Sequence, residues 1–387
     1  MVRRVYLDNN ATTPVLPEVL EAMRPYFGEH FGNASSIHRH GQETRAAVDR
    51  ARESVAALLS CPASEVVFTS GGTEADNLAI FGVASPGDHI VTSTIEHHAV
   101  LNSCRHLEAH GCEITYVPVD SCGLVDPGDV KRALRSNTSL ITIMLANNET
   151  GAVQSVEEIG KIAAEAGVYF HTDAVQAAGK IRVDVNKIGC DLLTISGHKF
   201  HGPQGVGALY VRKGTQLEPM LFGGRHERSR RAGTENVPGI VGLGKAAELA
   251  QAGFERGDDQ AMSTGRGRLE RELLKIEATG LNGEGAPRVP NTTNIYFDGI
   301  EGEALVIALD LKGLAVSTGA ACSSGAIEPS HVLTAMGLRP DRAKASIRFS
   351  LGKQNSAEDI EFALATVPAT VSRLRELSPV YRNLVSK

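Results

Sequence analysis

One lysine follows an apolar stretch and is flanked by small and donor-bearing residues. Lys199 lies in DLLTISGHKFHGPQGVGALYV (191–211), where a predicted strand ends at Ser196 and a second strand returns after a Gly and Pro turn. Partial burial at such a strand end lowers the pKa of a lysine amine and makes it a competent Schiff-base nucleophile. The hydroxyl of Ser196, the backbone of Gly197 and the imidazole of His198 are donors that suit a phosphate. The alternative is an ordinary surface lysine.

A carboxylate stands at the end of the preceding predicted strand. Asp173 follows VYFHT (168–172) and comes 26 residues before Lys199. If Lys199 holds pyridoxal phosphate, a carboxylate is needed beside the pyridine nitrogen to keep it protonated, because that cation is the electron sink. An aspartate at a strand end can equally cap a helix. Asp173 alone is therefore weak evidence for a pyridoxal-phosphate site, but its spacing from Lys199 makes the pair of residues informative.

A third element is typical of phosphate binding. FTSGGTEADN (68–77) reads as a strand, a glycine pair and a helix start, with Thr73 near the N-cap and Glu74 in the first turn. The free N–H groups and the positive end of the helix dipole at such a position attract anions. A simple capped helix is the alternative, and this element alone decides nothing.

A histidine follows the next predicted strand. His97 in TSTIEHHAV (92–100) is placed to lie on an aromatic cofactor and to transfer protons. A capping or surface histidine is the alternative.

Short apolar runs alternate with helical patterns from about Pro17 to Leu249, and this alternation must position these residues. Strands of four to eight residues separated by helices indicate a mostly parallel sheet covered on both faces, the α/β class. Ligands of such sheets bind beyond the carboxyl ends of the strands, where the polar residues gather. The predicted strands are EVVFTS, HIVTS, ITYVPV, LITIMLA, VYFHTDA, DLLTIS and ALYVR.

The chain is long enough for about two domains. A polar, glycine-containing stretch after residue 250 precedes strands and helices of different texture, which predict a smaller α+β domain. We expect a large cofactor-binding domain over 16–250 and a small domain over 251–387 that carries Cys322. The N-terminal segment, 1–15, is expected to join the small domain.

Composition excludes several classes of function. The 387 residues carry 39 basic and 45 acidic side chains, a formal charge of −6, which offers no broad surface for nucleic acid or an anionic membrane. The sequence shows no signal peptide and no apolar run of spanning length, so we expect a cytoplasmic enzyme acting on small molecules. Six scattered cysteines without a CxxC pair do not indicate a disulfide framework.

Nine motifs together resemble the cysteine desulfurases of the NifS/IscS type, and they occur along the chain in the same order as in that family. These desulfurases are class V aminotransferase-like enzymes dependent on pyridoxal phosphate. The resemblance runs from about residue 6 to about 352. The motifs are DLLTISGHKFHGPQGVGALYV, YLDNNATTP, NASSIHRHG, FTSGGTEADNLAI, IEHHAV, ANNETG, HTDAVQAAGK, GGRHERSRRAGTEN and STGAACSSGAIEPSHVL.

The resemblance implies fold type I of the pyridoxal-phosphate-dependent transferases and a role for each matched residue. Lys199 would form the Schiff base, Asp173 would pair with the pyridine nitrogen and His97 would stack on the ring. Gln176 would bond the phenolic oxygen and Asn148 would lie beside the cofactor and substrate. Residues holding the phosphate would be Gly72, Thr73, Ser196 and His198, with Thr234 reaching in from the second subunit of a homodimer. Arg348 would bind the substrate carboxylate, because arginine supplies a bidentate fork.

Cys322 would accept the sulfur of L-cysteine as a persulfide, releasing L-alanine. The stretch Ser317–Ser324 holds only Ser, Thr, Gly, Ala and Cys, which predicts an exposed, mobile loop suited to a reactive thiol. The persulfide would then pass to an acceptor protein, such as an iron-sulfur scaffold or a tRNA thiolation protein. The length of the loop that carries Cys322 resembles that of the longer-loop subgroup of the family.

Three alternatives remain at this point. A selenocysteine lyase or another class V transaminase would use the same scaffold, and a non-catalytic scaffold would need neither Lys199 nor Cys322. A zinc site could form from His106, His110 and Cys112 in RHLEAHGC, with the histidines at i, i+4. The pattern is not HExxH and a surface helix explains it as well, so we predict no metal.

Overall fold

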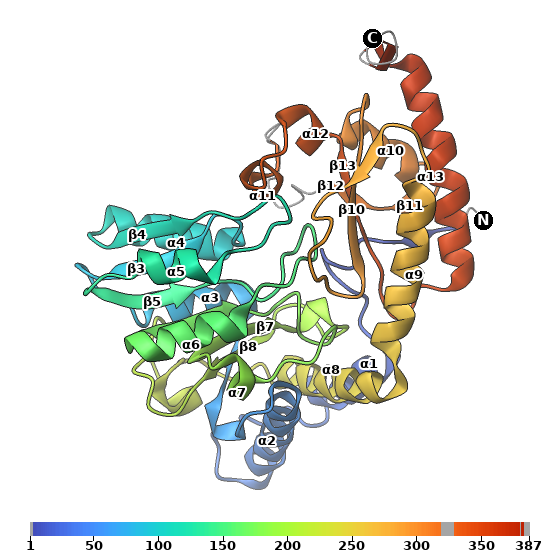
Figure 1. Ribbon diagram of the computed structural model, residues 1–387. Coiled ribbons are helices and arrows are strands. Elements are labelled where there is room, and N and C mark those ends of the chain that lie inside the picture. The colour runs from blue at the N-terminus through green and yellow to red at the C-terminus, as the bar shows by residue number, and fades with distance from the viewer. Residues whose placement is uncertain (1–2, 319–328, 380, 383–387) are drawn as a thin grey trace.

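The computed structural model describes residues 3–318, 329–379 and 381–382 of the chain. A seven-stranded sheet with its helices forms one part of the molecule, and a smaller sheet backed by long helices forms the other (Figure 1). The predicted α/β class with a smaller α+β portion is confirmed by this arrangement.

The large sheet contains all seven predicted strands, in the order β2-β8-β7-β6-β5-β3-β4. Strand β8 runs antiparallel to both of its neighbours, and the other neighbouring pairs are parallel. The strands are β2 (Val66–Thr69), β3 (His89–Ser93), β4 (Glu113–Val117), β5 (Thr138–Thr142), β6 (Tyr169–Asp173), β7 (Leu192–Ser196) and β8 (Gly207–Val211). The central strands β6 and β7 are almost wholly buried, as expected where helices cover both faces.

Helices pack on both faces of this sheet. Residues of α2, α5, α6, α7 and α8 share the main apolar core with one face, whereas α3 and α4 form two smaller cores on the other. The helices are α1 (Pro17–Met23), α2 (Arg39–Leu59), α3 (Gly72–Phe81), α4 (His98–Ala109), α5 (Pro127–Ala133), α6 (Val156–Ala166), α7 (Val185–Ile188) and α8 (Val237–Arg256).

The smaller part has a four-stranded antiparallel sheet in the order β12-β13-β10-β9. Its strands are β9 (Thr279–Leu281), β10 (Thr292–Phe297), β12 (Ser317–Thr318) and β13 (Ser346–Ser350). Its own core is shared with α9 (Asp258–Leu273), α10 (Gly302–Asp310) and α13 (Ala357–Leu377). Two short helices, α11 (His331–Ala335) and α12 (Pro340–Lys344), lie between β12 and β13 in the chain.

The two cores meet where α8 turns into α9. Buried residues of α8 up to Ala250 belong to the large core, and Leu269 and Leu273 of α9 belong to the small one. Gly257 between the helices has a φ of 80°, a conformation that favours glycine. The chain therefore changes direction here without losing helical structure on either side.

The first residues of the chain pack with the last part of it. Strand β1 (Val5–Tyr6) pairs in parallel with β11 (Leu314–Ala315), and Val5 and Leu7 join the small core. The chain then crosses to the carboxyl edge of the large sheet, where the Thr13 N–H donates to His198 O. Residues 8–13 thus lie between the two sheets.

Within the part of the chain that the structure describes, no helix has both the length and the apolar character needed to cross a bilayer.

Candidate active site

A cavity of about 350 Å³ opens at the carboxyl edge of the large sheet, facing β13 of the small one. Its lining includes ten of the thirteen residues predicted from the sequence, contributed by both sheets. They are Gly72, Thr73, His97, Asn148, Asp173, Gln176, Ser196, His198, Lys199 and Arg348.

Lys199 reaches the cavity from a short turn after β7. Its Nζ donates to the backbone oxygens of Asn10 and Ala11, at 2.7 and 2.8 Å. The same turn is held by Gly197, whose N–H donates to Val206 O. The lysine predicted from the sequence is therefore in contact with the N-terminal segment.

Asp173 ends β6 and is buried beside Lys199. One of its oxygens accepts from the Val175 N–H at 2.8 Å. Burial raises the pKa of this carboxyl to about 6, against the opposing effects of that hydrogen bond and of the Lys199 charge. A cation placed against Asp173 would bring its pKa down again, because opposite charges favour the ionised form.

The start of α3 lines the cavity next to Lys199 and Asp173. The first helical bond runs from the Ala75 N–H to Gly71 O, so the N–H groups of Gly72, Thr73 and Glu74 have no acceptor within the helix. A Cβ on Gly72 would lie 2.9 Å from Val175 Cγ2, so a side chain there would force Val175 to shift.

Glu74 would repel an anion at the start of α3 if its charge were unpaired. Its carboxylate accepts from Arg231 Nε at 2.8 Å and from the Ser70 N–H at 2.8 Å. The arginine offsets the acid, and the helix start keeps its attraction for an anion.

His97 precedes α4 and caps it. Its Nδ1 accepts from the Ala99 N–H at 3.1 Å, which assigns the proton of the neutral ring to Nε2. Burial, followed by the charge of Lys199, lowers the pKa of His97 to about 4. The imidazole is therefore neutral at physiological pH and able to donate from Nε2.

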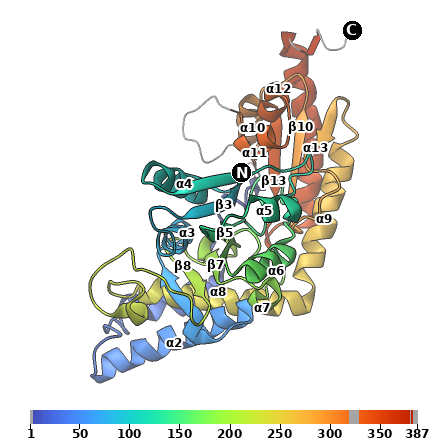
Figure 2. The same ribbon diagram turned by 60° about the vertical axis from the view of Figure 1, so that its left-hand side comes forward.

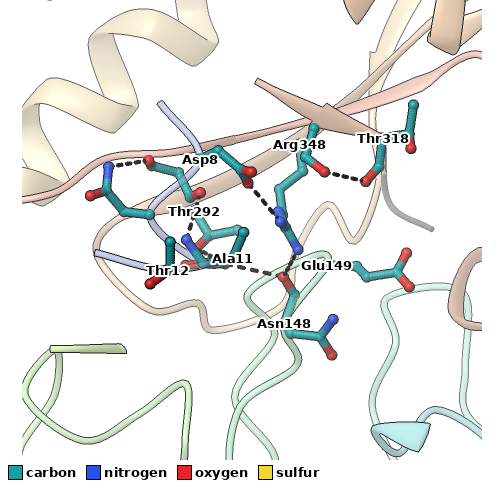
Figure 3. A network of polar contacts seen from close by, with 12 residues as sticks. Asp8, Ala11, Thr12, Asn148, Glu149, Thr292, Thr318 and Arg348 are labelled. Atoms are coloured by element: carbon teal, nitrogen blue, oxygen red, sulfur yellow. Dashed lines mark hydrogen bonds and ion pairs between the residues drawn. The ribbon is translucent and has the colours of Figure 1, made fainter. Parts of the chain in front are cut away.

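Arg348 on β13 lies across the cavity from the large sheet. Its Nη2 donates to Asp8 Oδ1 at 2.8 Å and its Nη1 to Asn148 O at 2.9 Å (Figure 3). Its Nε is buried and has no hydrogen-bond partner among the described residues. An unsatisfied donor of this kind suits a carboxylate ligand.

Among the described residues, two predicted site residues do not line the cavity. Gly197 lies in the turn behind Lys199, and Thr234 is exposed in the segment between β8 and α8. Cys322 lies outside the described residues.

The two histidines of the alternative zinc site contact each other, and the cysteine bonds a different residue. The His106 and His110 rings stack with centroids 4.1 Å apart, and the buried Cys112 thiol donates to Ser85 O. Among the described residues, no group of three or more His, Cys, Asp or Glu side chains is arranged to hold a metal ion.

Several residues that shape this site had no role predicted from the sequence. Asn10, Ala11 and Asp76 line the cavity, Asp8 pairs with Arg348, and Lys180 is buried behind Gln176. The motifs YLDNNATTP and HTDAVQAAGK contain four of these five residues, so the signal was present. What was missing was the information that the N-terminal segment crosses the sheet edge.

Comparison with known proteins gives consistent results. Residues 5–362 match the family described as Aminotransferase class-V. Cysteine desulfurase IscS of Methanosarcina thermophila is 52% identical over 390 residues, which cover 99% of this chain and 96% of that protein. A solved NifS-like protein has a TM-score of 0.89 at 38% identity and covers 96% of this chain and all of its own. The structure titled "SspA in complex with cysteine" has a TM-score of 0.80 at 37% identity and covers 91% of this chain and 99% of its own.

Proposed function

Because this chain belongs to the aminotransferase class V family, we propose that it is a pyridoxal-phosphate-dependent cysteine desulfurase. It converts L-cysteine to L-alanine and holds the sulfur as a persulfide on Cys322. The predicted family resemblance and fold type are confirmed by the comparisons. The observation that carries the proposal is the meeting of Lys199, Asp173 and the start of α3 in one cavity, with Arg348 opposite.

The cavity residues fit pyridoxal phosphate. Asp173 is a buried carboxylate whose raised pKa calls for a cationic partner, and the start of α3 offers N–H groups to a phosphate. Ser196 and His198 add side-chain donors, and Lys199 supplies the amine for covalent attachment. When bound, pyridoxal phosphate stabilises negative charge at the substrate α-carbon.

The chain's own residues divide the remaining work. Arg348 binds the substrate carboxylate through its fork, while Lys199 and the neutral His97 carry protons. Cys322 attacks the substrate sulfur, so an S–S bond forms as the C–S bond breaks. The electron pair of the broken C–S bond stays with the β-carbon of the substrate, and this carbon takes up a proton to become the methyl group of alanine. One thiol proton ends on the methyl group, and no external oxidant is needed.

Properties of the other cysteines support Cys322 as the acceptor. Burial raises the pKa of both Cys61 and Cys104 to about 12, and it also raises the pKa of Cys112 and Cys190. These thiols are therefore poor sources of the thiolate nucleophile. Cys122 lies in a turn outside the cavity lining, where its Sγ donates to Glu284 O.

A two-fold homodimer forms part of this proposal, with Thr234 of each subunit completing the other's phosphate site. The segment between β8 and α8 projects from the sheet (Figure 2). Large apolar side chains are exposed on this segment and near the start of α2, namely Phe27, Phe31, Ile37 and Phe222. A dimer interface over these elements would remove their apolar side chains from water. Sedimentation should show a dimer, and a fully active monomer at micromolar concentration would contradict this part.

Delivery of the persulfide to an acceptor protein, such as an iron-sulfur scaffold or a tRNA thiolation protein, completes the proposal. The experiment that tests the function is incubation of the cofactor-loaded protein with L-cysteine and no keto acid. Alanine should be released together with sulfide or persulfide. A transaminase would instead require a keto acid and would retain sulfur in its product.

A further inference from the structure

A second lysine is buried behind the cavity and takes no part in the chemistry assigned above. Lys180 follows β6 in the motif HTDAVQAAGK and is 5% exposed. Burial lowers the pKa of its amine well below the ordinary value, and the charges of Lys199 and Arg348 lower it further. Lysine is rarely buried without a specific partner, so its contacts show what it does.

The Lys180 amine makes two hydrogen bonds, both to side-chain amide oxygens. Its Nζ donates to Gln176 Oε1 at 2.6 Å and to Asn10 Oδ1 at 3.1 Å. Amide oxygens can only accept, so Nζ is the donor in both bonds, and each amide turns its oxygen toward Lys180 and its nitrogen away.

The nitrogen atoms of both amides then fall on groups that can only accept, or on hydroxyl oxygen. Gln176 Nε2 donates to Asn10 O at 3.0 Å. Asn10 Nδ2 donates to Asn148 O at 3.1 Å and to Thr292 Oγ1 at 2.8 Å. The orientation of Gln176 is thus fixed at both ends, by Lys180 at its oxygen and by the backbone oxygen of Asn10 at its nitrogen.

Gln176 lines the cavity, and only one of its two amide N–H groups has an acceptor among the described residues. With the oxygen held by Lys180, the group that remains for a ligand is a donor. A flipped amide would present an acceptor to the electron-rich phenolic oxygen of pyridoxal phosphate, and two acceptors repel.

We propose that Lys180 is a positioning residue, which keeps the Gln176 amide donor directed to the cofactor. The inference rests on the proposed function, because it concerns the binding of pyridoxal phosphate. It predicts that loss of Lys180 weakens cofactor binding by way of Gln176 and not through a general loss of stability.

The experiment is a double-mutant cycle on cofactor affinity. The apoproteins of the wild type, Lys180→Met, Gln176→Ala and the double variant are titrated with pyridoxal phosphate, and the visible absorbance gives Kd. Lys180→Met should raise Kd about tenfold, the loss expected for one buried hydrogen bond, and should shift the absorption maximum. On the Gln176→Ala background the same change should alter Kd less than about twofold, because the partner is already absent. Lys187→Met, at an exposed lysine of α7, is the matched control.

A second variant keeps the test open if Lys180→Met does not fold. Gln176→Glu retains an oxygen for Lys180, now as an ion pair, but replaces the N–H donor with a second oxygen. The melting temperature of this apoprotein should change little, because the ion pair with Lys180 offsets the lost bond from Gln176 Nε2 to Asn10 O, while Kd rises by about tenfold or more.

Each outcome bears on one claim. A wild-type Kd in Lys180→Met or Gln176→Glu, or an equal effect of Lys180→Met on both backgrounds, overturns the role of Lys180. Failure of the wild type to bind pyridoxal phosphate overturns the proposed function instead.

Discussion

The two walls of the cavity are built in different ways. On the wall formed by the large sheet, Asp173 ends β6, Lys199 follows the neighbouring parallel strand β7, and Gly72 starts a helix at the same sheet edge. On the opposite wall, Arg348 comes from the small sheet and meets Asp8 and Asn148, which lie 340 and 200 residues away in the chain. The first wall depends on one sheet, and the second depends on the docking of distant segments.

This difference separates two functions. The large-sheet wall carries the groups that fit a cofactor, and the opposite wall carries Arg348, whose Nε has no partner among the described residues and which fits a substrate carboxylate. Substitutions on the first wall should therefore change cofactor binding. Those on the second should change the KM for cysteine and leave the cofactor in place.

The largest effect is expected at Lys199. Lys199→Ala removes the amine that binds the cofactor covalently, so desulfuration should fall by at least about a thousandfold. Borohydride treatment followed by peptide mass mapping should find no cofactor fixed to the variant. Lys161→Ala, at an exposed lysine of α6, should behave as the wild type. Fixation at wild-type yield in Lys199→Ala would show that another residue holds the cofactor.

Arg348→Lys tests the opposite wall. Lysine keeps the charge but loses the planar fork, so the KM for L-cysteine should rise by roughly ten- to a hundredfold. The Kd for pyridoxal phosphate should change less than about twofold, since Arg348 comes from β13 of the small sheet, whereas Lys199, Asp173 and the start of α3 belong to the large one. An equal loss of cofactor affinity would erase the distinction between the walls.

A smaller effect is expected at Asp8, where substitution should lower the KM for L-cysteine. Its carboxylate accepts from Arg348 and places a negative charge where the substrate carboxylate must bind. Asp8→Asn keeps an acceptor for Arg348 and removes that charge, so steady-state kinetics should give a KM a few-fold lower. A markedly higher KM would mean that Asp8 acts mainly by holding Arg348 in place.

The smallest effect concerns stability and not catalysis. Burial raises the pKa of Glu96, which precedes His97, to about 8 from an ordinary value of 4.5. The folded protein therefore holds a proton that the unfolded chain releases, and the unfolding free energy falls as the pH rises from about 4.5 to about 8. In Glu96→Gln apoprotein this contribution is absent, so the melting temperature should fall less between pH 5 and pH 8. Glu108→Gln, exposed on α4, should keep the wild-type slope; an unchanged slope in Glu96→Gln would contradict the assignment.

The same contrast explains what the sequence could predict. All seven strands of the large sheet were predicted, because each is a short apolar run between helical patterns. Lys199 and Asp173 could be paired from spacing alone, since both follow neighbouring strands.

The opposite wall had no such signal. No periodicity links Asp8 or Asn10 to residues hundreds of positions later, and the pairing of β1 with β11 depends on tertiary packing. Arg348 was found only through the family resemblance. Lys180 was read as part of a motif but not as a buried group, because a lysine in a sequence is expected at the surface.

The most direct test of the proposed function follows the sulfur itself. The cofactor-loaded protein is mixed with a limiting amount of sulfur-labelled L-cysteine, quenched with an alkylating agent and digested, and the labelled peptide is identified by mass spectrometry. We predict the label as a persulfide on the peptide that contains Cys322, with one alanine released for each labelled sulfur. Label on another cysteine, or normal alanine release by Cys322→Ser, would contradict the proposal.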